Sequence, residues 1–157
     1  MKTTRETAKE ESHNQLVNNL QELLEQNYDA EDDYKKALKK IEDGTLRSFL
    51  KEKAVQHNHY STELEKVLRS LNERPKEKGS TKGTFFRAWM DIKTALSFDK
   101  DEAVLEECIR GEKEAMKEYE EKLKKHKFPP TIEAVLQKQL SEIRVTVAEI
   151  QTLEDLE

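Results

Sequence analysis

The sequence has few of the residues that interrupt regular structure, with 4 glycines and 3 prolines in 157 residues. Glycine and proline are the residues that mark turns and loops most strongly, so little of the chain can be irregular. Glutamate, lysine, leucine and glutamine, which favour helices, are abundant instead. This composition predicts a protein built from long helices.

Cysteine and long apolar runs are also scarce. The one cysteine, Cys108, excludes an internal disulfide, and no CxxC motif accompanies it, so we interpret it as a buried structural thiol. No stretch approaches the roughly 20 apolar residues of a membrane-spanning helix. The first fifteen residues lack the apolar core of a signal peptide. Together these absences predict a soluble cytoplasmic protein that does not bind a membrane.

The chain lacks a face of one charge. The net charge is −5, and its 28 basic and 33 acidic residues are interspersed. Without a basic face we expect no nucleic-acid partner. Charged residues make up 39% of the sequence and hydrophobic residues 34%. Half-exposed helices tolerate this balance, because only one stripe of each helix needs to be buried.

Apart from Gly111, which lies inside a helical pattern, the few breakers cluster at residues 42–45, 74–83 and 128–131. Short connections between helices produce antiparallel hairpins, whereas the long middle connection can cross the bundle from end to end. The sequence therefore predicts an all-α antiparallel four-helix bundle, with the topology that ferritin-like folds use. We expect a flexible N-terminal segment over 1–13 and one domain over 14–157, with long helices at 14–42, 46–72, 100–126 and 131–155 and a short helix at 84–97 in the crossover.

Each long helix has an apolar stripe that becomes polar near its middle. Counting from the turns at 1.5 Å per residue places these interruptions within about two helical turns of a common level. We therefore expect one polar layer inside the bundle. Its predicted members are Asn27, Glu31, His57, Tyr60, Glu112, Gln139 and Glu142.

The segment Glu107–Glu112, followed by Tyr119, resembles the third helix of rubrerythrin-type ferritin-like proteins, where a Gly-Glu pair supplies an iron ligand. Asn27 and Tyr34 resemble their first helix, with asparagine in place of the ligand glutamate. Over about residues 16–155 the chain more closely resembles a bacterial ferritin-like four-helix family, the domain of unknown function 2383 type. The runs that carry this resemblance are Ala54–Leu64, Trp89–Leu96, Leu105–Glu112 and Leu136–Ile143. The resemblance implies a ferritin-like bundle without an established activity.

The resemblance also indicates what the polar layer lacks. Of the positions that correspond to ligands in the di-iron relatives, Glu112 alone keeps its identity, and amides stand at 27 and 139. Amide oxygens bring no charge and do not bridge two irons as carboxylates do. One interpretation is a degenerate site in a non-enzymatic protein without a cofactor, stress-related by analogy with the fold. The alternative is a metal-binding protein or weak oxidase holding iron or manganese at His57, Glu112, Glu142 and Glu31.

An apolar face is expected on the short crossover helix. We interpret this face as packed on the bundle. The alternative is an exposed patch that forms a homodimer or binds another partner. The residues of the face are Phe85, Phe86, Trp89, Ile92 and Leu96.

Overall fold

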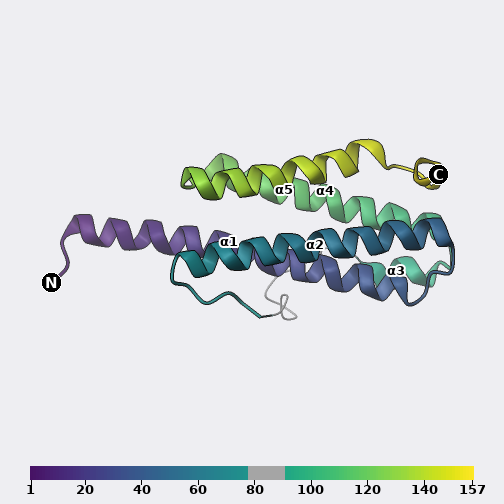
Figure 1. Ribbon diagram of the computed structural model, residues 1–157, viewed down its shortest axis with the longest axis horizontal. Helices are drawn as coiled ribbons and strands as arrows, with labels where there is room; N and C mark the ends of the chain where they lie inside the picture. The colour runs from purple at the N-terminus through teal and green to yellow at the C-terminus, as the bar shows by residue number, and fades with distance from the viewer. Residues whose placement is uncertain (78–90) are drawn as a thin grey trace.

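The computed structural model describes residues 1–77 and 91–157. In these two ranges every regular element is helical. Two long hairpins lie one above the other, and their helices run nearly parallel to a common long axis (Figure 1). The elements are α1 (Thr4–Leu38), α2 (Gly44–Ser70), α3 (Ile92–Ser97), α4 (Asp101–Lys125), α5 (Pro130–Glu149) and a 3-10 helix, η1 (Leu153–Leu156).

Short turns join α1 to α2 and α4 to α5, so each pair is an antiparallel hairpin (Figure 1). The connection between the hairpins carries α3, which packs on α4 and α1. The prediction of an all-α antiparallel four-helix bundle with a crossover is confirmed. One core of leucine, isoleucine and tyrosine side chains runs between the hairpins.

α1 begins at Thr4 rather than at residue 14. Thr3 and Glu6 form a capping box: the backbone N–H of Glu6 donates to Thr3 Oγ1 over 3.1 Å, and that of Thr3 to Glu6 Oε2 over 2.9 Å. The first turns of α1 extend beyond the other helices and are exposed (Figure 1). The flexibility of residues 1–13 stays a prediction.

The other helix ends also follow local capping. The Asp43 carboxylate accepts the backbone N–H of Leu46 over 2.8 Å at the start of α2. Pro130 occupies the first turn of α5, where its missing N–H costs nothing. α5 ends at Glu149 rather than at 155: the backbone is extended at Ile150, and Thr152 and Asp155 then form a new capping box that opens η1.

In the crossover, α3 begins at Ile92, within the expected helix over 84–97; residues 84–90 of that prediction lie outside the described residues. Asp91 caps it, and Ile92 is buried while Leu96 packs against the core from a half-buried position. Phe85, Phe86 and Trp89, which belong to the expected apolar face, lie outside the described residues.

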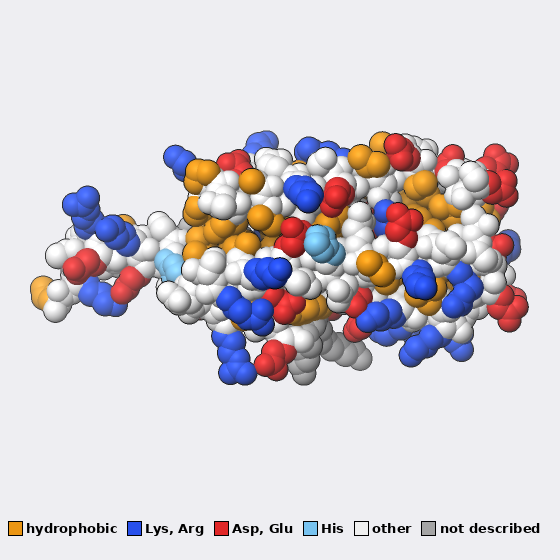
Figure 2. All heavy atoms as spheres, in the orientation of Figure 1, with side chains coloured by type: hydrophobic (Ala, Val, Ile, Leu, Met, Phe, Trp, Pro, Cys, Tyr) orange, Lys and Arg blue, Asp and Glu red, His pale blue; other side chains and the backbone are white. Residues whose placement is uncertain are grey.

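On the visible face, acidic and basic side chains are interspersed, and apolar side chains show between the two hairpins (Figure 2). Within the described ranges, no helix is both long enough and apolar enough to cross a membrane.

Candidate functional site

A buried histidine on α2 lies at the centre of the polar layer. His57 is only 1% exposed, and both of its ring nitrogens have partners on other helices. Its Nε2 lies 2.7 Å from Oε1 of Glu112 on α4, and its Nδ1 lies 2.7 Å from Oδ1 of Asn27 on α1. His57 therefore links the two hairpins.

The orientation of the Asn27 amide follows from a backbone carbonyl. Asn27 Nδ2 lies 2.8 Å from the carbonyl oxygen of Leu23 and 2.9 Å from the hydroxyl of Tyr119. A carbonyl oxygen can only accept, so the amide atom facing it must be the nitrogen. The other amide atom is then the oxygen, and it must accept the Nδ1–H of His57. This fixes one proton on the imidazole.

A second proton lies between His57 and Glu112. Glu112 is fully buried, and its Oε1 also accepts the hydroxyl of Tyr34 over 2.8 Å. Burial by itself raises the pKa of Glu112. The charge of His57 and the hydrogen bonds from His57 and Tyr34 outweigh burial, and the pKa lies below its ordinary value of 4.5. The lowered pKa of Glu112 thus favours its carboxylate form beside the imidazole of His57.

This lowered pKa predicts an acid-sensitive contribution to stability. A carboxyl whose pKa is lower in the folded state stabilises fully above its unfolded pKa and loses that contribution as pH falls through the folded value. We expect the free energy of unfolding, measured in urea, to fall more steeply below about pH 4.5 in the wild type than in Glu112→Gln. Equal pH dependence of the two proteins would contradict this prediction.

The network continues from Asn27 to the other side of the bundle. The Tyr119 hydroxyl, which accepts from Asn27, donates to Gln139 Oε1 on α5 over 2.6 Å. Gln139 Nε2 in turn lies 3.2 Å from Oε1 of Glu63 on α2. Each donor therefore points the same way along a chain that begins at His57, crosses all four long helices and ends at a carboxylate.

A second polar group lies beside this chain. The hydroxyl of Tyr60 donates to Glu142 Oε1 over 3.0 Å, and burial together with the charge of Glu142 raises the pKa of Tyr60. The ammonium of Lys53 donates to Thr146 Oγ1 over 2.7 Å. These contacts join α2 to α5.

The structure brings some of the predicted site residues together and separates others. Asn27, His57 and Glu112 are in direct contact, and Tyr60 and Gln139 are buried near them. Glu142 is half-buried and binds Tyr60.

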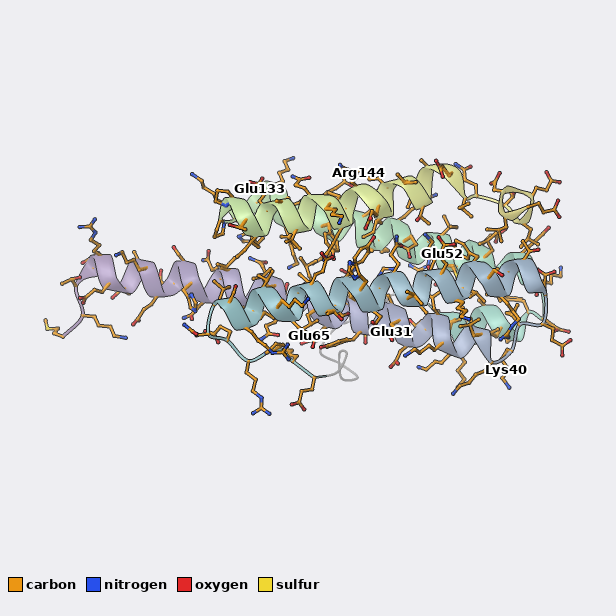
Figure 3. All side chains as sticks on the ribbon, viewed as in Figure 1. Glu31, Lys40, Glu52, Glu65, Glu133 and Arg144 are labelled. Atoms are coloured by element: carbon orange, nitrogen blue, oxygen red, sulfur yellow. The ribbon has the colours of Figure 1, made fainter. Side chains whose placement is uncertain are left out.

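Glu31 lies away from this group. It is half-buried on α1, where its carboxylate accepts from Asn58 Nδ2 over 3.2 Å and pairs with Lys35 over 2.6 Å. Figure 3 shows it on the α1–α2 hairpin, on the side away from α5.

Two tyrosines of the network were not among the predicted members of the layer. Tyr34 and Tyr119 occupy apolar-stripe positions, and their rings pack as the stripes predict. The missed signal was the hydroxyl, because a buried tyrosine usually needs a hydrogen-bond partner. Two tyrosines at the level of the polar layer therefore indicate further members of it.

The metal-binding capacity of these residues can be judged from their free lone pairs. In the described ranges, no group of three or more histidine, cysteine, aspartate or glutamate side chains is placed to hold a metal ion. The imidazole of His57 has both nitrogens engaged by hydrogen bonds. Glu112 Oε2 is buried and has no hydrogen-bond partner in the described part of the chain.

Residues 15–125 match the model of a protein family described as Domain of unknown function (DUF2383). The chain belongs to this family. Its fold is also similar to a crystal structure described as ferritin like, diiron-carboxylate proteins from Bacillus anthracis str. Ames. The TM-score is 0.56 at 14% sequence identity, with 87% of this chain and 88% of that chain covered. None of the curated proteins matches the chain.

At this level of identity the structural similarity shows a shared fold. The expected resemblance to a ferritin-like family of unknown function is thus confirmed. For a member of the DUF2383 family the function has to be inferred from the buried network and from the surface.

Proposed function

We propose that this chain is a non-enzymatic ferritin-like bundle in which a hydrogen-bonded network takes the place of a di-iron centre. The observation that carries the proposal is the double engagement of His57. Its Nδ1 donates to Asn27 and its Nε2 shares a proton with Glu112, so the ring offers no lone pair to a metal.

Charge supports the same conclusion. Two ferrous ions bring four positive charges, and di-iron centres in this fold neutralise them with carboxylates from all four helices. Here the layer holds one fully buried carboxylate, Glu112, and it already neutralises His57. Asn27 and Gln139 contribute amides whose nitrogens are engaged as donors. This donor set does not fit a pair of irons.

A network of this kind has a structural use. Each member has a defined donor and acceptor, so a shift of one helix along another would break several bonds at once. Buried polar residues fix register in this way in coiled coils. We infer that the network aligns the two hairpins and that the function resides on the surface of a rigid bundle.

One observation favours a second candidate, a protein that binds a single metal ion. Glu112 Oε2 is buried without a hydrogen-bond partner among the described residues, and a carboxylate oxygen is a suitable ligand for iron or manganese. In this alternative Glu112 would hold the ion with His57 released from the network and Glu142 turned inward.

Elemental analysis distinguishes the structural network from the single-metal site. The protein would be purified without an affinity tag and loaded anaerobically with Fe(II) or Mn(II), beside Glu112→Gln. We expect no more metal in the wild type than in the variant, since the ring nitrogens and Oε1 are occupied.

About one ion per chain in the wild type, absent from Glu112→Gln, would overturn the proposal and favour the metal-binding alternative. A cytoplasmic location, a homodimer and a stress-related role stay predictions.

A further inference from the structure

A buried lysine at the floor of a surface cleft has no carboxylate partner among residues 1–77 and 91–157. Lys53 on α2 is only 7% exposed, so its amino group is largely removed from water. The lysines that form ion pairs in the described part of the chain are others: Lys2, Lys35, Lys76 and Lys122. An unpaired buried charge is costly, so this ammonium needs a further partner.

The contacts that Lys53 does make leave part of its bonding capacity unused. Its Nζ donates to Thr146 Oγ1 over 2.7 Å, while Gln56 Oε1 lies at a long 3.4 Å. The Phe49 ring centroid is 5.7 Å away. An ammonium has three hydrogens, and these neutral contacts use two at most. The charge of Lys53 helps to lower the pKa of Glu112, but in the described ranges no hydrogen bond or ion pair joins the two side chains, and Lys53 Nζ donates to Thr146 and Gln56 instead.

Lys53 lines a cleft between α2, α5 and η1. The cleft has a volume of about 770 Å³, which lies within the range of small-molecule sites. The cleft is also lined by three residues with hydroxyl groups, Ser48, Ser141 and Thr146, of which Thr146 binds the lysine. A small ligand with an anionic group could therefore reach the ammonium and find further hydrogen-bond donors beside it.

The rim of the same cleft is acidic. Glu52 and Glu149 are exposed there, and neither forms an ion pair with any residue of 1–77 or 91–157. Figure 3 shows Glu52 on α2, on the side of that helix that faces α5. Two further acids at the cleft are engaged: Glu142 by the Tyr60 hydroxyl, and Asp155 by the backbone N–H groups of residues 151 and 152. Free negative charge at the rim thus accompanies positive charge at the floor.

We propose that this cleft binds a small zwitterion, a molecule with one carboxylate and one ammonium group such as a free amino acid. The carboxylate accepts from Lys53 and the neighbouring hydroxyls. The ammonium faces Glu52 and Glu149. A simple anion would be repelled by the rim, and a simple cation would be repelled by the floor, so a ligand of both charges fits the cleft best.

Calorimetric titration of the full chain tests the proposal. Glycine, β-alanine and γ-aminobutyrate would serve as zwitterions of increasing length, with acetate and ethylamine as singly charged controls. We expect at least one zwitterion to bind about tenfold more tightly than either control, the effect of one additional ionic contact. Lys53→Met should abolish this binding, whereas Lys51→Met, at an exposed position of the same helix, should leave it unchanged.

If Lys53→Met does not fold, Glu52→Gln and Glu149→Gln test the rim instead. They should weaken zwitterion binding and leave acetate binding unchanged or stronger. The proposal is overturned if none of the zwitterions binds, if acetate binds as tightly as they do, or if binding survives in Lys53→Met or is unaffected by both rim variants.

Discussion

Replacing either His57 or Glu112 with leucine should lower the free energy of unfolding by about 3–5 kcal/mol, because each change leaves the other member of a buried ion pair without its partner. His57 is 1% exposed and Glu112 is fully buried, so water cannot replace the hydrogen bond that the remaining side chain loses. Chemical denaturation monitored by circular dichroism measures the effect. It should exceed that of any single change on the exposed surface.

The double variant His57→Leu/Glu112→Leu provides the control for this prediction. Replacing a whole buried pair with apolar side chains is often neutral, so we expect the double variant to regain most of the lost stability. Tyr34→Phe, added to it, should regain more, since the Tyr34 hydroxyl would otherwise lose its acceptor. Additive losses in the double variant would mean that the two side chains do not act as a pair.

Asn27→Leu should lower the free energy of unfolding by about 2–3 kcal/mol, the cost of leaving buried polar groups without partners. The change removes the acceptor for His57 Nδ1–H and the donor to the Tyr119 hydroxyl. Because these bonds align α1 with α2 and α4, the variant should also show weaker protection of core amides in hydrogen exchange.

Asn18→Leu is the matched control, since Asn18 lies on the same helix but is exposed. It should change stability little. If Asn27→Leu were as stable as the wild type and kept a single sharp unfolding transition, the network would not be needed for helix register.

The sequence was sufficient to predict the helices and their pairing, because these depend on the spacing of apolar residues and on the positions of glycine and proline. The same period placed Asn27, His57 and Glu112 at core positions, where they are buried. Polar residues at core positions need hydrogen-bond partners. Counting helical turns from the connections between helices placed the polar residues of the four helices at one level of the bundle. The contacts between the three are thus largely a consequence of backbone geometry.

Periodicity does not predict whether a side chain at the edge of an apolar stripe points into the core or towards solvent. Glu31 occupies a position of the α1 stripe, yet it lies where α1 meets α2 and reaches Asn58 and Lys35 at the surface. A long flexible side chain beside the core can turn either way, and burial of an unpaired carboxylate favours the outward direction. Periodicity reports the position of the Cβ atom and leaves the position of the carboxylate open.

The start of α1 shows a signal that was present but not used. Thr3 and Glu6 have the spacing of a capping box, and the structure has both of its hydrogen bonds. The missing cue was an apolar stripe, since residues 4–12 are exposed. The part of a helix that extends past its bundle has a capped end but no buried face. Hydrophobic periodicity therefore places the start of such a helix too far along the chain.

The fixed orientation of the two amides restricts how this chain can change over generations. Aspartate at position 27 would place an oxygen against the Leu23 carbonyl, and glutamate at 139 would place one against the Glu63 carboxylate. Each step toward a carboxylate-rich core is therefore unfavourable alone, and such a core becomes accessible only when several positions change together. The direction of the hydrogen bonds thus opposes the appearance of a carboxylate-rich core through single substitutions.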